Sequence, residues 1–396
     1  MIQERLKALR AEMEKRGITV YVVPTADFHE SEYVGDHFKA RKFITGFTGS
    51  AGTAVITLDE AGLWTDGRYF VQAENQLKDS TVTLYRMGEE GVPTVDEFVK
   101  DRLKEGGCLG FDGRVVNGTW GGRLEKIAAE KNVSMHVTED LIDLIWEDRP
   151  ALSKQPLLIL EEKYSGKSTA DKIGDLRKAM KENGADVHIL TSLYDIAWLL
   201  NIRGNDIDYV PVVLSYLVLN ETECIWFLQE EVVDDKIRAY LEENHITTKP
   251  YDAIYDYVPE IPADAVVLMN RGTVNYRIVN SLDKAIKVVD KPNPTELMKA
   301  VKNKTEVDNT RAAHVKDGVA FTKFMYWLKT NIGKIPMTEI SASDYLEARR
   351  REQDNFIELS FNTICAYGAN AAMMHYAATP ESDAELKPEG FLLVDS

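Results

Sequence analysis

The sequence has 396 residues, which is too long for one ordinary domain and, at roughly 150 residues per domain, predicts two or three. Hydrophobic residues make up 44% and charged residues 28%, the balance of a folded globular chain rather than a disordered one. The 64 acidic and 47 basic side chains give a net charge of -17, which argues against a nucleic-acid partner because phosphate binding needs a local excess of Lys and Arg.

The cysteine content and the first residues indicate the compartment. Cys108, Cys224 and Cys365 are far apart and form no CxxC pair, so we expect neither a disulfide framework nor a zinc ribbon. This pattern favours a reducing compartment. The N-terminus carries charges from its fourth residue and has no apolar core, so it is not a signal peptide, and no apolar run is long enough to span a membrane. We therefore expect a cytoplasmic protein with no membrane partner.

The chain opens with a helix followed by a strand. Leu6, Leu9 and Met13 have helical spacing, and Gly17 supplies a stop for that helix. The apolar stretch 18–24 then reads as a strand.

The same pattern returns 167 residues later. Leu176, Met180 and Gly184 repeat the spacing of Leu9, Met13 and Gly17, and the stretch 185–191 repeats the strand. A spacing that long indicates duplicated domains rather than a solenoid.

Two proline-containing stretches suggest where the domains divide. The first, 149–156, reads as a linker, and the second copy closes near 291–294. We therefore predict domains over 1–152, 153–294 and 295–396.

The third domain has a different texture. Thr305 with Asp308 forms a capping-box pattern before a long amphipathic helix that reaches about Lys329, and a second capped helix starts near Thr338. We expect a β-rich stretch over 357–376 and a buried strand over 391–394.

Three residues are candidates for chemistry, and the first is Asp395. It ends the apolar strand 391–394, where a carboxylate is costly to bury without a partner. A metal ion is one such partner, and a capping role at a strand-to-turn junction is the alternative.

His375 is the second candidate. A lone histidine among small and apolar residues is usually a hydrogen-bonded core residue. Here it lies 20 residues before Asp395, and both belong to β-type segments, so the two could face one pocket.

Arg68 is the third candidate. A helix is expected to begin at Gly67, which places Arg68 in the first turn, where the helix dipole disfavours a cation. A salt bridge to Asp66 explains it, and so does an anionic or carbonyl group that arrives from elsewhere. The nearby Gly46, Gly49 and Gly52 do not form a phosphate loop, because no Lys-Ser/Thr follows and the next element is a strand, so we interpret them as turn glycines.

Several segments along the chain together resemble the three-domain Xaa-Pro aminopeptidases of the creatinase and aminopeptidase P family. The match over 64–70 and the spacing from His375 to Asp395 are specific to that family. The matching segments are 46–54, 64–70, Asp195 to Trp198 with Arg203-Gly204, 299–303, and His375-Tyr376 before 393–396.

The resemblance implies an α/β chain with two tandem creatinase-like N-terminal domains, followed by the first part of an α+β pita-bread catalytic domain. It implies a homodimeric enzyme that removes the N-terminal residue from peptides with proline in second position. Family members hold two divalent metal ions, usually manganese, with two Asp, one His and two Glu. Asp395 matches the first metal-binding Asp, His375 a substrate-contacting catalytic histidine, and Arg68 a substrate-binding arginine.

The resemblance also implies that the remaining metal ligands would follow Ser396. We therefore expect a chain truncated within its catalytic domain, which by itself binds no metal pair and is inactive. A prolidase or creatinase is the alternative enzyme. A pita-bread domain that lacks metals and serves as a binding module, as in a histone-chaperone subunit, is the alternative from another class.

Overall fold

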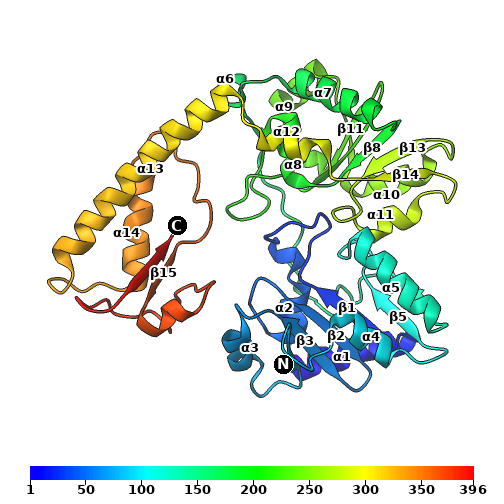
Figure 1. Ribbon diagram of the computed structural model, residues 1–396, viewed down its shortest axis with the longest axis horizontal. Coiled ribbons are helices and arrows are strands. Elements are labelled where there is room, and N and C mark those ends of the chain that lie inside the picture. Colours follow the sequence, from blue (N-terminus) through cyan, green and yellow to red (C-terminus); the bar gives the residue numbers. More distant parts are fainter. The chain divides into compact units, whose positions relative to one another are not determined.

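The computed structural model describes residues 1–396, which form two compact units (Figure 1). The first unit contains Met1–Glu162, Lys167–Ile207 and Pro211–Val301. The second contains Lys163–Gly166, Asp208–Val210 and Lys302–Ser396. None of the helices combines the length and the apolar character that a membrane crossing requires.

The first unit begins with a six-stranded mixed sheet in the order β4-β3-β2-β1-β5-β6. β1 lies at its centre, antiparallel to β2 and parallel to β5. The strands are β1 Val20–Pro24, β2 Thr53–Thr57, β3 Ala61–Thr65, β4 Thr83–Arg86, β5 Cys108–Phe111 and β6 Ser134–His136. The helices are α1 Ile2–Lys15, α2 Ala40–Thr45, α3 Phe70–Leu77, α4 Val95–Arg102 and α5 Gly118–Glu130.

Alternate side chains of these strands enter two separate cores, because successive residues of a strand point to opposite faces. One core joins Tyr21 and Val23 to residues of α1, α2 and α3. The other joins Val20 and Val22 to residues of α4 and α5. The sheet is therefore covered by helices on both faces.

A second sheet of the first unit repeats this topology in the order β12-β11-β10-β8-β13-β14. The strands are β8 Val187–Leu190, β10 Ser215–Asn220, β11 Cys224–Leu228, β12 Thr247–Pro250, β13 Val266–Met269 and β14 Lys287–Asp290. Its helices are α7 Thr169–Glu182, α8 Leu193–Leu200, α9 Asp235–Glu243, α10 Ile254–Tyr257, α11 Tyr276–Ser281 and α12 Pro294–Ala300. A small strand pair, β7 Leu158–Ile159 and β9 Ile202–Arg203, and the short helix α6 Glu162–Ser165 precede or connect these elements.

The two sheets agree in the direction of every neighbouring pair as well as in strand order. Gly17 and Gly184, which end the first helix of each copy, both have a positive φ, +67° and +64°. Glycine is favoured there because it lacks the Cβ that makes this conformation costly. The duplication predicted from the sequence is thus confirmed, while the domain boundaries at 152 and 294 stay proposals.

The stretch 291–294 is not an extended linker. Pro294 begins α12, which packs against α7 and α8, and the first compact unit continues to Val301. Proline is well accommodated at the first position of a helix, where its missing N–H would have no partner in any case.

The first unit has two halves, each built on one of the six-stranded sheets. They meet through a reciprocal backbone contact. The Gly118 amide donates to the Val274 carbonyl over 2.8 Å, and the Tyr276 amide donates to the Val116 carbonyl over 2.7 Å. In each bond the first residue of one helix donates to the residue two positions before the other helix. The same chain position thus makes the same contact twice.

Close packing of α5 against α11 accompanies these bonds. A Cβ added to Gly121 would lie 2.1 Å from the Tyr276 ring, and one added to Gly118 would lie 2.7 Å from the Val279 side chain. Two glycines of α5 therefore receive two larger side chains of α11. The contact depends on the absence of side chains on one partner.

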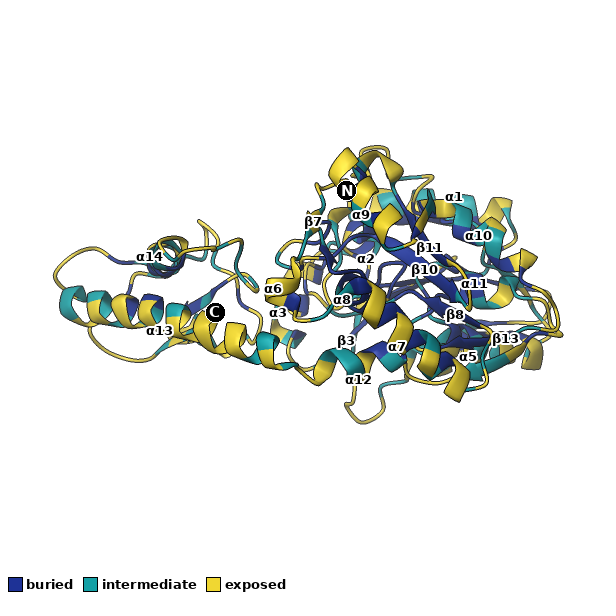
Figure 2. Cartoon of the chain, turned by 90° about the horizontal axis from the view of Figure 1, so that it is seen from above, coloured by how far each residue is buried: buried dark blue, intermediate teal, exposed yellow.

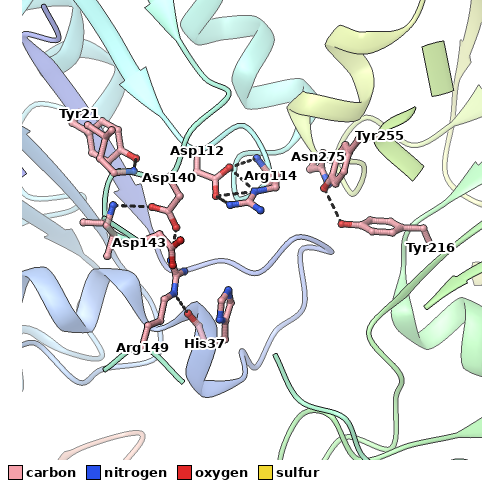
Figure 3. A network of polar contacts seen from close by, with 12 residues as sticks. Tyr21, His37, Asp112, Arg114, Asp140, Asp143, Arg149, Tyr216, Tyr255 and Asn275 are labelled. Atoms are coloured by element: carbon pink, nitrogen blue, oxygen red, sulfur yellow. Dashed lines mark hydrogen bonds and ion pairs between the residues drawn. The ribbon is translucent and has the colours of Figure 1, made fainter. Parts of the chain in front are cut away.

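Figure 3 shows a network of polar contacts in the first unit. Arg114 makes a two-pronged ion pair with Asp112, and Arg149 donates to Asp140 over 2.6 Å. Burial, together with the neighbouring Asp112 carboxylate, raises the pKa of Asp140. Asp112 and Asp140 are thus paired with arginines rather than left alone in the interior, as buried charge requires.

His29 crosses between the two halves. One ring nitrogen, Nδ1, lies 3.0 Å from the Thr191 carbonyl, and Nε2 lies 2.6 Å from the Tyr251 hydroxyl. A neutral ring satisfies both neighbours if Nδ1 donates and Nε2 accepts. Burial lowers the pKa of His29 to about 4, although the Asp27 carboxylate and the Thr191 carbonyl oppose this effect.

The second unit is built on two helices and a two-stranded antiparallel sheet. α13 Lys304–Asn331 and α14 Glu339–Arg351 pack together, and Trp327 stacks on Tyr345 with ring centroids 4.0 Å apart. β15 Ile364–Tyr367 pairs with β16 Leu392–Asp395, and the 3-10 helix η5 Gly368–Ala372 follows β15. Figure 2 shows that most of α13 is exposed.

Three expectations for this unit are corrected. α13 is capped by Asn303 with Glu306 rather than by Thr305 with Asp308, because Asn is the stronger N-cap and its amide also donates to the Ser165 carbonyl. The stretch 357–376 contains only the short strand β15, followed by η5. The last strand is buried on one face only: Leu392 and Val394 pack against the core of this unit, whereas Leu393 and Asp395 point to the other face and are exposed.

Replacing Gly121 with Ala should destabilise the first unit by about 1–3 kcal/mol, because the added methyl group forces the Tyr276 ring to move. Gly122→Ala in the same helix is the matched control, since a Cβ there meets nothing within 4 Å. We expect that change to be neutral or to stabilise, because Ala favours a helix more than Gly does. Urea unfolding of both variants measures the difference, and equal effects would contradict the proposed contact.

The contribution of His29 to stability should fall on acidification. The unfolded chain binds a proton at the ring below pH 6.5, whereas the folded chain does not until about pH 4. Because the buried ring stays neutral, its contribution to the free energy of unfolding falls by about 2 kcal/mol between pH 7 and pH 5. Urea unfolding at the two pH values should show a smaller loss in His29→Gln, which has no titratable group at this position.

Other groups also titrate with shifted pKa values, because burial lowers the pKa of His188 and raises those of Asp140 and Asp206. The difference between the wild type and His29→Gln therefore isolates the contribution of the His29 ring. An identical pH dependence in the wild type and in His29→Gln would show that the ring is not held neutral.

Candidate functional site

Arg68 lies in the first unit on a turn before α3. Its guanidinium makes a two-pronged ion pair with Asp66, with both bonds at 2.8 Å, and its side chain is 48% exposed. The ion pair raises the pKa of Arg68. The salt bridge considered from the sequence is therefore present.

The helix expected at Gly67 begins instead at Phe70, so the helix-dipole argument for Arg68 was wrong. The Asp66 carboxylate also accepts the Arg68 amide over 3.1 Å, and this local bond favours a turn over a helical start.

The glycine loop beside this turn is organised by a buried arginine. Arg41 donates to the carbonyls of Phe47 and Gly49 and to the Thr25 hydroxyl, and no carboxylate pairs with it. Burial lowers the pKa of Arg41 to about 10. Gly46 has a φ of +79°, and a Cβ on Gly49 would lie 2.2 Å from the Phe47 ring. These glycines serve a tight turn and close packing, as interpreted from the sequence.

His375 and Asp395 both belong to the second unit, but the strand register places them differently. Asp395 pairs with Ile364 at the start of β15. The segment that carries His375 leaves from the other end, after Tyr367, three residues or about 10 Å along the strand. Both side chains are exposed. That they face one pocket stays a prediction.

Asp395 does not lie at the end of a buried strand, so the burial argument made for it from the sequence does not hold. Its carboxylate is exposed and accepts no hydrogen bond from the chain. The next residue, Ser396, is fixed by Arg350, whose guanidinium lies 2.9 Å from the Ser396 hydroxyl and 2.7 Å from Asp317. The strand end is thus anchored while the Asp395 oxygens face solvent.

A buried carboxylate that the sequence did not predict contacts Tyr376, the residue after His375. Glu339, the first residue of α14, has no exposed surface and accepts hydrogen bonds from the Tyr367 amide at 2.6 Å and the Ala384 amide at 3.1 Å. The Tyr376 hydroxyl at 2.7 Å and the Asn370 amide group complete its partners. Its only signal in the sequence is a Glu directly after a capping Thr, which is ordinary helix chemistry.

No group of three or more His, Cys, Asp or Glu side chains lies together in an arrangement that could hold a metal ion. Asp395 offers exposed carboxylate oxygens, the ligand type that hard divalent ions prefer. One carboxylate does not suffice for the two-metal site that the resemblance implies.

A groove of about 680 Å³ in the second unit lies near the Asp395 end of the sheet. α13, the end of α14 and the stretch 353–360 line it, together with Ser396. His375 and Asp395 are not among its lining residues.

Comparison with known proteins follows the same division of the chain. Residues 5–145 and residues 148–306 each match a family described as the Creatinase/Prolidase N-terminal domain. Residues 308–396 match Metallopeptidase family M24. The predicted fold class, with two creatinase-like domains followed by the beginning of a pita-bread domain, is therefore confirmed.

Curated relatives cover nearly the whole chain. The probable Xaa-Pro aminopeptidase P of Chaetomium globosum is 37% identical over 99% of this chain, and that of Sordaria macrospora is 38% identical over 99%. The chain spans 65% and 66% of the lengths of these two relatives.

A solved structure agrees with these relatives. The X-prolyl aminopeptidase of Caenorhabditis elegans, described as a cytosolic enzyme with a di-nuclear active site, is 31% identical. The match covers all of this chain and 67% of that one, with a TM-score of 0.94. The chain therefore belongs to the Xaa-Pro aminopeptidase P family, within the M24 metallopeptidases.

Proposed function

We propose that the polypeptide to which this chain belongs is a metal-dependent Xaa-Pro aminopeptidase, which hydrolyses the bond before a proline in second position and releases the first residue. The observation that carries the proposal is the combination of two creatinase-like sheets of identical topology with an M24 segment in one chain. That combination is shared with the X-prolyl aminopeptidase matched at a TM-score of 0.94.

The metal ions of this enzyme are two divalent ions, for which we propose manganese. When bound, such a pair supplies an activated water for attack on a peptide carbonyl. In this proposal Asp395 is one oxygen ligand, supported by its exposed carboxylate at an anchored strand end. The other ligands belong to the length that the relatives have and this chain does not span.

His375 and Arg68 act toward the peptide substrate in this proposal. His375 is exposed beside a rigidly bonded segment, which suits a group that contacts substrate. Arg68 carries a half-exposed guanidinium, which suits recognition of a peptide carbonyl or carboxylate. We further propose a cytoplasmic homodimer. A solved relative described as cytosolic supports the location.

A polypeptide with the length of the relatives should cleave Xaa-Pro peptides and contain about two equivalents of divalent metal. Asp395→Ala should abolish turnover and lower the metal content, because a ligand is lost. His375→Ala should lower turnover while the metal content stays normal. Asp344→Ala, which removes an exposed carboxylate from α14, is the matched control and should change neither. Metal analysis and peptide hydrolysis measure these outcomes.

Equal cleavage of Xaa-Ala and Xaa-Pro peptides would contradict the proposed specificity. Cleavage of dipeptides alone would indicate a prolidase. A protein that binds no metal and cleaves nothing would indicate a binding module.

Arg68→Ala should weaken kcat/KM more for longer peptides than for dipeptides, because we assign Arg68 to substrate residues beyond the proline. Arg123→Ala, which removes another exposed arginine paired with an Asp, is the matched control. Exposed ion pairs contribute about 1 kcal/mol or less, so neither change should unfold the protein. The same loss for dipeptides and longer peptides would show that Arg68 does not bind the extended part of the substrate.

A further inference from the structure

The buried carboxylate of Glu339 accepts hydrogen bonds from the chain on both sides of His375. Its donors are Tyr367 and Asn370 before the histidine, and Tyr376 and Ala384 after it. Four positions within 18 residues of an otherwise irregular segment thus meet one acceptor. The histidine lies between them.

Glu339 cannot itself contact a substrate, because it has no exposed surface. No Lys or Arg forms an ion pair with it, so neutral donors and the first turn of α14 are its whole electrostatic support. The first turn of a helix favours a carboxylate. Each of these donors is difficult to displace, because the loss of one hydrogen bond would leave the buried carboxylate less well solvated.

Tyr376 connects this carboxylate to the histidine. Its buried hydroxyl donates to Glu339 over 2.7 Å and also lies 3.0 Å from the Asn370 amide and 2.9 Å from the Ser382 hydroxyl. A hydroxyl has one proton to donate, and the charged acceptor is the strongest available. Tyr376 is the residue next to His375, so its fixed ring limits where the His375 backbone can lie.

We propose that Glu339, acting through Tyr376 and Asn370, is the positioning residue for His375 in the peptidase reaction. The inference rests on the proposed function, because it assigns a purpose to the exact placement of His375. A substrate-contacting group must be held to within a fraction of an ångström, and a misplacement of 1 Å can cost about a hundredfold in rate.

The test uses the polypeptide with the length of the relatives, with metal bound. Glu339→Gln keeps the shape of the side chain but turns one acceptor oxygen into a donor that faces other donors. We expect kcat for an Xaa-Pro peptide to fall about tenfold to a hundredfold, with the metal content unchanged. Glu385→Gln makes the same chemical change at an exposed position of the same loop and should leave kcat unchanged.

A double-mutant cycle separates positioning from a general effect on folding. If Glu339 acts through His375, Glu339→Gln should change kcat less than about twofold once His375 is already Ala, because coupled residues are not additive. Independent losses that multiply in the double variant would overturn the inference. So would a Glu339→Gln variant with wild-type kcat.

Should Glu339→Gln fail to fold, Tyr376→Phe replaces it, because Phe keeps the ring and removes the hydroxyl that bonds Glu339, Asn370 and Ser382. The same cycle with His375→Ala then decides in the same way. If the wild type releases no residue from Xaa-Pro peptides, the proposed function itself fails and this inference fails with it. If the wild type is active and the cycle is multiplicative, only this inference is overturned.

Discussion

The first unit depends on two reciprocal backbone hydrogen bonds between its halves, from Gly118 to Val274 and from Tyr276 to Val116. Buried backbone groups must find partners, and here each half supplies the partner for the other. These bonds fix the distance between α5 and α11. The buried groups that cross the same junction, such as the His29 ring, can then meet both neighbours at hydrogen-bond distance.

In the second unit, a buried carboxylate rather than a set of strand pairings holds the chain. The chain between β15 and β16 has little regular structure, so it lacks the repeated backbone bonds that fix a sheet. A single carboxylate can accept hydrogen bonds from several donors, and here it does so in place of the backbone bonds of a sheet. Glu339 thus gives an irregular segment a defined shape, whereas the first unit obtains its shape from regular strands.

The sequence predicted those features of the fold that depend on neighbouring residues. The helix that ends at a glycine and the strand that follows it were identifiable twice, because helical spacing and a glycine stop are local signals. Competing local signals were harder to rank: Asn303 and Thr305 both resemble caps, and a distant carbonyl at Ser165 favours the first.

The candidate site was only partly predictable. Arg68, His375 and Asp395 were candidates on local arguments that left alternatives open, and only the resemblance to a family assigned their roles. Their surroundings depend on pairing between distant residues. The exposure of Asp395 follows from which face of β16 meets the core, and the partners of Glu339 lie 28 to 45 residues away in sequence. Neither arrangement has a local signature, because spacing along the chain does not reveal which distant segments meet.

The glycines of α5 also decide which halves can pair. The reciprocal bonds are those that two identical subunits would form about a two-fold axis. The helices beside them are unlike, with Gly118 and Gly121 facing Val279 and Tyr276. If two copies of the first half paired, the glycines of α5 would face each other and leave a void. If two copies of the second half paired, the large side chains of α11 would clash. Although its backbone bonds are symmetric, this interface therefore favours pairing of a first half with a second half. Pairing between two first halves or two second halves of different chains is disfavoured.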